Sequence, residues 1–346
     1  MLSFAPSTSS HESNMLIRVE HETILDYSEP VCETVIEVRM SPPSTEDQTV
    51  SGYRLKVHPH VPTTNYRDGF GNRVDLFNIG PAHDRIQIAS TSYVRTHRRA
   101  NASKLAELPW PTPDADQGHD VDVLEFLRFS PFVDDCPELA GFVERLPRNH
   151  KSFAAGLDAL MQAVNERLKY EKQVTTAQTP VSEALQLGRG VCQDFAHLFL
   201  GACRGLGVPA RYVSGYVNQP GELATHAWCQ VWAGQALGWV DIDPTRGQFV
   251  NGHHIVIAVG RDFSDVAPNK GCSKGLGVET ITVAVKVETV DRMPTNWSDH
   301  VAAGRPLPPK SVPALWYSDE VNSRHQMPSR SSPLRHQKSQ QQQVSC

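Results

Sequence analysis

The chain has 346 residues and an apolar content of 39%, which is enough for a buried core and suits two domains. Its formal net charge of −5 is small for this length. It argues against nucleic-acid binding, which normally requires a basic excess. No run of eighteen apolar residues occurs, so we expect neither a transmembrane helix nor a membrane partner.

Cysteine usage indicates the compartment. Seven cysteines are widely spaced and none forms a CxxC pair, which is typical of free thiols in a reducing environment rather than of a disulfide framework. Residues 1–14 lack the apolar core of a signal peptide, and we predict a flexible extension there, with Met1 or Met15 as the start. The sequence therefore predicts a cytoplasmic protein.

Residues 15–100 have the period-two alternation of strands and no helical pattern. The runs around Ile17–Tyr27, Val31–Met40 and Tyr53–Val57 alternate apolar and polar side chains, and the Asp68–Asn72 segment (Asp-Gly-Phe-Gly-Asn) provides turn residues. Several short strands without helices predict an all-β, sandwich-like N-terminal domain.

The rest of the chain divides into three segments. Residues 101–120 contain three prolines and predict a linker or an extended cover segment. Residues 121–295 combine helical patterns with later strands, which predicts an α+β catalytic domain. Residues 296–346 form a C-terminal extension that turns rich in Ser, Arg, Gln and His, and we expect disorder from about residue 321.

The segment that carries the chemistry begins at Gly188. Gly-Arg-Gly-Val precedes Cys192, and a helical apolar pattern follows until Gly207 and Pro209. A cysteine at a helix N-terminus lies at the positive end of the helix dipole, which favours the nucleophilic thiolate. Cys203 and Cys229 lie inside apolar patterns and are better candidates for buried structural thiols.

Two later strand patterns provide a base and an acid. His226 lies in Thr225–Trp232, and Asp243 ends Gly238–Asp243 before Pro-Thr. Cysteine, histidine and aspartate are the nucleophile, base and orienting group of covalent catalysis. Asp241 competes with Asp243, because both point to the same side of a strand and periodicity does not separate them. His197 lies more than a helical turn from Cys192, and we interpret it as structural.

At these residues the chain resembles the transglutaminase-like superfamily of papain-type cysteine enzymes, in the bacterial subgroup with an N-terminal β domain. The matching blocks are Gly190–Ala196, Pro209–Tyr216, His226–Trp228, Gly238–Thr245 and His254–Asp262. The resemblance implies a papain-like core and a triad of Cys192, His226 and Asp243. By analogy it also implies an oxyanion donor upstream, for which Tyr170 is the candidate beside the Cys192 backbone N–H.

Two further residues are expected near the triad. Trp228 is predicted to pack in the core and to cover the imidazole of His226. Asp194 is predicted to be a first-turn acid of the cysteine helix with a structural or supporting role, since a carboxylate there interacts well with the helix dipole.

These observations leave three functions open. The first is a cysteine-dependent amide-bond hydrolase, a peptidase or isopeptidase that forms a thioester acyl-enzyme with a peptide or protein substrate. The second is acyl transfer from protein glutamine to amines, and the third is a non-catalytic peptide-binding module. We expect no cofactor: a zinc site of Cys192, His226 and Asp243 lacks the usual paired ligand spacing, and no EF-hand-like loop occurs. The sequence does not predict an oligomeric state.

Overall fold

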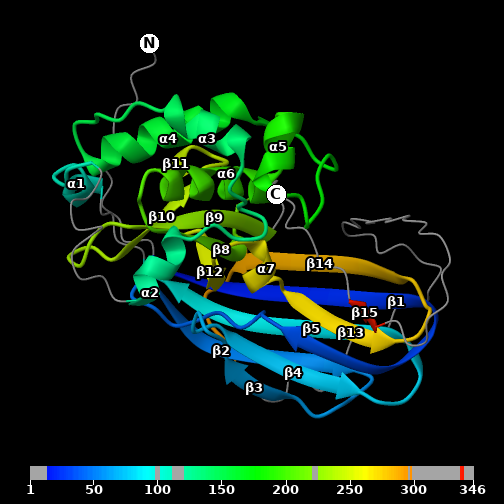
Figure 1. Ribbon diagram of the computed structural model, residues 1–346. Coiled ribbons are helices and arrows are strands. Elements are labelled where there is room, and N and C mark those ends of the chain that lie inside the picture. Colours follow the sequence, from blue (N-terminus) through cyan, green and yellow to red (C-terminus); the bar gives the residue numbers. More distant parts are fainter. Residues whose placement is uncertain are drawn as a thin grey trace.

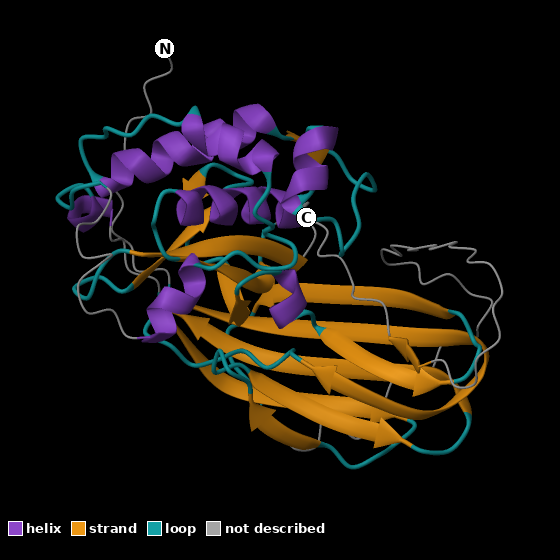
Figure 2. Ribbon diagram, in the orientation of Figure 1, coloured by secondary structure: helices purple, strands orange, loops and turns teal. Residues whose placement is uncertain are grey.

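The computed structural model describes residues 14–97, 102–110, 121–219, 225–294, 297 and 336–338. Helices gather at one end of the molecule and long strands at the other, with a smaller sheet between them (Figure 1, Figure 2). The large sheet comprises β1 (Met15–Val38), β2 (Gln48–His58), β3 (Thr64–Arg67), β4 (Arg73–Ile79), β5 (His83–Thr96), β13 (Asn269–Lys274), β14 (Glu279–Thr289) and β15 (His336–Lys338).

The long strand β1 organises this large sheet. Its first half lies between β5 and β14, and β5 pairs further with β2. Its second half, after a register shift between Asp26 and Val31, lies between β4 and β13. Apolar side chains from both halves form one buried cluster that includes Leu25, Ile36 and Phe77. The β-rich, sandwich-like N-terminal part predicted from the sequence is confirmed.

The last strands of the chain differ from the sequence-based domain limits. Strand β14 pairs with β1 from Ile17 to Tyr27, and β13 pairs with β1 near Ile36. Residues 269–289 therefore complete the N-terminal sheet, although the sequence assigned them to the catalytic domain. Their alternating pattern predicts a strand correctly, but alternation carries no information about which strand is the partner.

Residues 210–260 contain a five-stranded antiparallel sheet in the order β11-β10-β9-β8-β12. Its strands are β8 (Ala210–Val217), β9 (Thr225–Trp232), β10 (Trp239–Asp243), β11 (Gln248–Phe249) and β12 (His254–Gly260). Two-residue strands β6 (Lys169–Tyr170) and β7 (Arg189–Gly190) pair separately. The helices are α1 (Ala102–Leu105), α2 (Val121–Leu124), η2 (Glu125–Leu127), α3 (Pro137–Glu144), α4 (Phe153–Arg167), α5 (Val181–Leu187), α6 (Cys192–Gly205) and α7 (Phe263–Val266).

Helices α4 and α6 form the centre of the core. Helix α4 begins at Ser152, whose hydroxyl accepts the Ala155 backbone N–H at 3.2 Å, a regular N-cap. The apolar face of this helix is buried from Phe153 to Val164. Helix α6 is buried along almost its whole length and packs on α4 and β9. Among the described helices, none combines the length and apolar character needed to span a membrane.

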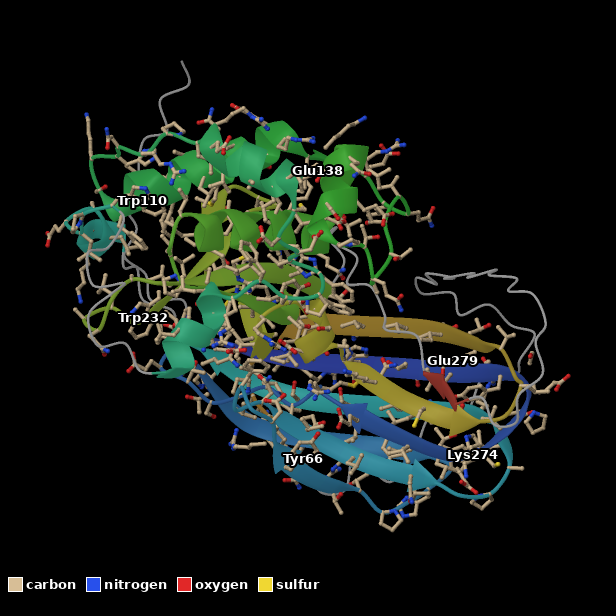
Figure 3. The ribbon with its side chains drawn as sticks, in the orientation of Figure 1. Tyr66, Trp110, Glu138, Trp232, Lys274 and Glu279 are labelled. Carbon is tan, nitrogen blue, oxygen red and sulfur yellow. The ribbon has the colours of Figure 1, made fainter. Side chains whose placement is uncertain are left out.

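The proline-containing segment packs on the helices. Leu105 is fully buried, and the Trp110 ring lies 5.3 Å from that of Phe153, so residues 102–110 cover the start of α4 (Figure 3). The remaining part of the predicted linker, 111–120, lies outside the described residues. So do residues 1–13 of the extension predicted at 1–14. The C-terminal extension predicted at 296–346 is described only at 297 and 336–338, and 336–338, in the part predicted to be disordered, form β15, which pairs with β13.

Two side-chain amides join the N-terminal sheet to β12, one of the two edge strands of the five-stranded sheet. Gln48 donates to the Val256 carbonyl and accepts the Val256 N–H, both at 2.9 Å. Asn72 makes the same pair of bonds to Val259, both at 2.8 Å. Each amide thus replaces one residue of a neighbouring strand, which satisfies backbone groups that an edge strand leaves unpaired.

Candidate active site

Two glycines shape the turn in front of Cys192. Gly188 ends α5 with φ of 67°, a left-handed conformation that favours glycine. Gly190 pairs with Tyr170 in the short β6–β7 ladder. A Cβ at position 190 would overlap the carboxylate of Asp194, so only glycine fits there. The Gly-Arg-Gly sequence is therefore required to bring the chain back onto the start of α6.

Asp194 ties down the beginning of the cysteine helix. Its Oδ2 accepts the Val191 backbone N–H and the Thr175 hydroxyl, both at 2.7 Å. The carboxyl group is buried, and burial raises its pKa to about 6 although both hydrogen bonds favour the charged form. Asp194 thus caps α6 two residues after Cys192, which agrees with the supporting role expected from the sequence.

Cys192 is the first residue of α6, with Val191 as the N-cap. Its side chain is fully buried, and its sulfur is disulfide-bonded in this structure, so it must be reduced before it can act as a nucleophile. The helix behind it packs on β9, where Ala227, Cys229 and Val231 belong to the same apolar cluster as α6. The predicted placement of Cys192 at the N-terminus of a helix that packs on the histidine strand is thus what the structure shows.

His226 and Asp243 meet between neighbouring strands. The His226 Nε2 lies 2.7 Å from Asp243 Oδ2, and the two side chains are 1% and 0% exposed. Asp243 Oδ1 accepts the backbone N–H groups of Thr245 and Arg246 at 3.1 and 3.2 Å. Burial alone would raise the pKa of Asp243, but the charge and hydrogen bond of His226 lower it below its usual value. The carboxyl group is therefore an anion held against an imidazole.

Asp241 has a different partner, although it lies on the same strand. Its Oδ1 accepts the indole N–H of Trp228 at 2.7 Å and the Gln230 amide at 3.0 Å. The Trp228 ring stacks on His226 with 6.1 Å between centroids, as expected for a side chain that covers the imidazole. Gly215, opposite His226, leaves the space that this indole occupies. The structure thus resolves the choice between the two aspartates in favour of Asp243 as the partner of His226.

His254 is the residue near the triad that sequence reasoning did not select. It opens β12 and is fully buried, with Nε2 at 3.4 Å from Asp243 Oδ2. Burial lowers its pKa to about 4, while Asp243 opposes this change. The sequence shows only the start of an apolar strand with two consecutive histidines. Its place in the block His254–Asp262 is the signal that could have drawn attention to it.

Tyr170, the candidate oxyanion donor, lies in β6. Its backbone pairs with Gly190, two residues before Cys192, and its ring packs 6.3 Å from that of Phe195. The pairing brings the residue to the turn in front of the nucleophile. Its role as a donor stays a prediction.

Three other side chains considered in the sequence are structural groups: Cys203, Cys229 and His197. Burial raises the pKa of both Cys203 and Cys229 well above the usual range of a thiol. His197 is buried, and its Nε2 accepts the Phe263 backbone N–H at 3.2 Å, while burial lowers its pKa to about 4. These three residues therefore pack the core, as the sequence indicated.

One group among the described residues could offer three metal ligands. The ligand atoms of His226, Asp243 and His254 all lie within 4.8 Å of one another. The 2.7 Å contact between His226 and Asp243 is a hydrogen bond, and a metal ion would have to break it. We therefore treat the three residues as a hydrogen-bonded cluster and not as metal ligands.

This fold and this pair of side chains define an α+β protein with a transglutaminase-like core. The sequence profile of the transglutaminase-like superfamily matches residues 140–244, and that of the bacterial transglutaminase-like N-terminal region matches residues 17–95. The chain belongs to the transglutaminase-like superfamily, which confirms the resemblance in the sequence.

Its relatives include an uncharacterised protein of Mycobacterium leprae. The two are 32% identical over 281 residues, 78% of this chain and 98% of the relative. An uncharacterised protein of Mycobacterium tuberculosis is 31% identical over 272 residues, 73% of this chain and 86% of the relative.

A crystal structure from Cytophaga hutchinsonii, provisionally described as a cysteine protease, has the same fold. It superposes with a TM-score of 0.68 at 23% identity and covers 82% of this chain and 93% of its own. At this identity the likeness shows that the two chains share a fold.

Proposed function

We propose that the protein is a cysteine-dependent amide-bond hydrolase, a peptidase or isopeptidase, that acts through Cys192, His226 and Asp243. The observation that carries this proposal is the buried 2.7 Å contact between His226 Nε2 and Asp243 Oδ2, in a chain where Cys192 is the first residue of helix α6. The carboxylate accepts a hydrogen bond from the N–H at Nε2, so the imidazole gains and loses its second proton at Nδ1.

The reaction follows from these three groups. The Cys192 thiolate attacks the carbonyl carbon of the scissile amide, and a carbon–sulfur bond forms. His226, as imidazolium, gives its Nδ1 proton to the leaving nitrogen, and the carbon–nitrogen bond breaks to leave a thioester. The neutral imidazole then takes a proton from water, which attacks the thioester, releases a carboxylic acid and restores the thiolate. Asp243 stabilises the imidazolium of His226 in the first step and holds the neutral imidazole in the same orientation in the second step.

The negative charge on the carbonyl oxygen needs donors during both attacks. The Cys192 backbone N–H at the start of α6 is the first candidate, because the initial N–H groups of a helix have no partner within the helix. Tyr170 is the second candidate, since the β6–β7 ladder brings it to the same turn. Asp194 and the two glycines fix the backbone from which the first donor projects.

Acyl transfer to an amine is the alternative reaction at the same triad. It would begin with a glutamine side chain, release ammonia and form the same thioester, which an amine instead of water would resolve. Hydrolysis is preferred because water needs no second binding site. A non-catalytic peptide-binding module is the third candidate. The buried contact between His226 and Asp243 argues against it, because peptide binding alone does not require an oriented imidazole.

Incubation with a library of glutamine-containing peptides distinguishes the three functions. Mass spectrometry of the full-length protein with a primary amine and a phosphine reductant should show truncated peptides for hydrolysis and a mass gain with ammonia loss for transfer. The variant C192A should do neither. Peptide capture without any product, equal in the wild type and C192A, would refute catalysis.

The setting of this activity is part of the proposal. We propose a peptide or protein substrate, and a cytoplasmic location, which the free thiols of Cys32, Cys136, Cys203, Cys229 and Cys272 support.

A further inference from the structure

We propose that His254 is a positioning residue of the active site: it donates a hydrogen bond from Nε2 to Asp243 and thereby fixes the carboxylate that orients His226. This inference rests on the proposed function, because it gives His254 a role in the same reaction. The contact itself can be tested separately from catalysis.

The surroundings of the His254 ring determine where its proton lies. Its Nε2 is 3.4 Å from Asp243 Oδ2, and its Nδ1 is 3.1 Å from Asn251 Oδ1. The Asn251 oxygen also accepts the His253 backbone N–H at 3.0 Å, which fixes the orientation of that amide. Both ring nitrogens thus face acceptors. The carboxylate is the stronger acceptor because it is charged, so the proton belongs on Nε2.

The Asp243 carboxylate has a divided set of partners. Oδ1 is held by the backbone N–H groups of Thr245 and Arg246, which belong to the turn after β10. Oδ2 accepts from both imidazoles, and the Arg246 Nε lies 3.6 Å away. Without His254, the only imidazole left on Oδ2 is the one whose position the carboxylate must fix. The second imidazole therefore defines the angle at which His226 is held.

Neighbouring elements hold His254 in place. Trp228 packs against it edge to face, with 5.3 Å between ring centroids, and the same indole stacks on His226. Two residues further along β12, Val256 is bound on both backbone groups by Gln48 of the N-terminal sheet. The position of His254 relative to Asp243 is thus set by β12 on one side and by the indole on the other.

Nuclear magnetic resonance of the full-length protein, with ¹⁵N-labelled histidine and a phosphine reductant, tests the contact directly. We expect the His254 ring to carry a proton on Nε2, with assignment from the spectrum of H254Q. A neutral ring protonated only on Nδ1 would overturn the proposal. The Nε2–H resonance of His226 should stay close to its wild-type position in H254Q, whose amide N–H replaces the donor, and should move in H254F.

A chemical readout links the contact to the nucleophile. After reduction with the phosphine, the protein is treated with iodoacetamide near neutral pH. Peptide mass mapping should show Cys192 alkylation slowed about tenfold or more in H254F and within about threefold of wild type in H254Q, as expected for loss of a bond to a charged group. The matched control is H253Q at the adjacent histidine, which should react like the wild type. Equal rates in all three folded variants would overturn the positioning role.

Failure of the proposed function gives a different pattern. If wild-type Cys192 reacted no faster than the buried Cys203, the catalytic proposal would fail, while the proton on His254 Nε2 would still report on the contact. If H254F does not fold, H254Q and the wild-type tautomer decide the question, because both readouts are defined for them.

Discussion

Replacing Gln48 with leucine should loosen the outer strand of the catalytic sheet from the N-terminal part. The Gln48 side chain is 1% exposed and makes three hydrogen bonds, two to Val256 and one to the Pro43 carbonyl at 2.8 Å. Leucine has a similar volume but neither donor nor acceptor. The variant therefore leaves the N–H and C=O of Val256 buried without their partner, and the apolar packing changes little.

The expected cost follows from these unpaired groups. A buried polar group without a partner costs about 1–3 kcal/mol, so the two groups of Val256 together give a loss of about 2–6 kcal/mol in the free energy of unfolding. Urea unfolding followed by tryptophan fluorescence measures it, and the denaturant dependence should keep its slope, since the exposed surface does not change.

The control for this variant is a glutamine on the surface. Gln186 is exposed, and its amide donates to the Glu138 side chain at 3.1 Å, so Q186L should change the free energy of unfolding by less than about 0.5 kcal/mol. If Q48L lost no more stability than Q186L, the side-chain amide would not be replacing a strand, and the joint between the two parts of the molecule would need another explanation.

Three other predictions test the site. D243N should slow Cys192 alkylation near neutral pH by about 10²-fold or more because His226 loses its anionic partner, whereas D241N should change it less than about threefold; peptide mass mapping compares them. Burial raises the pKa of Asp194 to about 6, so its contribution to stability is full below about pH 4 and is lost as pH rises through about 6. The free energy of unfolding of D194N, measured by urea titration at several pH values, should therefore depend less on pH in this range than that of the wild type. Deleting residues 1–97 should give a product that is insoluble, or unfolded as measured by circular dichroism, since β14 loses β1 as its hydrogen-bonding partner.

Much of the site could be predicted because the chemistry is local in the sequence. The glycine turn, the helix start at Cys192 and the strand with His226 each have a short-range signal, and the structure agrees with each one. Asp243 could be separated from Asp241 only through the residues that follow it. Their turn directs two backbone N–H groups at Oδ1 of Asp243, while Asp241 lies within the strand and serves an indole.

The features that could not be predicted depend on partners that are distant in the sequence. His254 is recognisable only when β12 has been placed, because nothing within its own strand refers to Asp243. The pairing of β14 with β1 joins residues more than two hundred positions apart, and the alternating pattern of each strand is compatible with many partners. Gln48 and Asn72 are ordinary polar residues in their own segments, and their function is defined by a strand that the chain forms much later.

These long-range contacts change the interpretation of the N-terminal part. The sequence suggested a separate β domain at the N-terminus. In the structure, residues 269–289 belong to the same sheet, although they follow the five-stranded sheet in the sequence. The side-chain amides of Gln48 and Asn72 bind the outer edge of β12. An edge strand with a buried, unpaired row of N–H and C=O groups is unstable, so β12 needs those amides. Because His254 begins β12 and lies 3.4 Å from Asp243, the N-terminal sheet takes part in holding the Asp243 carboxylate, although it contributes none of the three residues of the proposed triad.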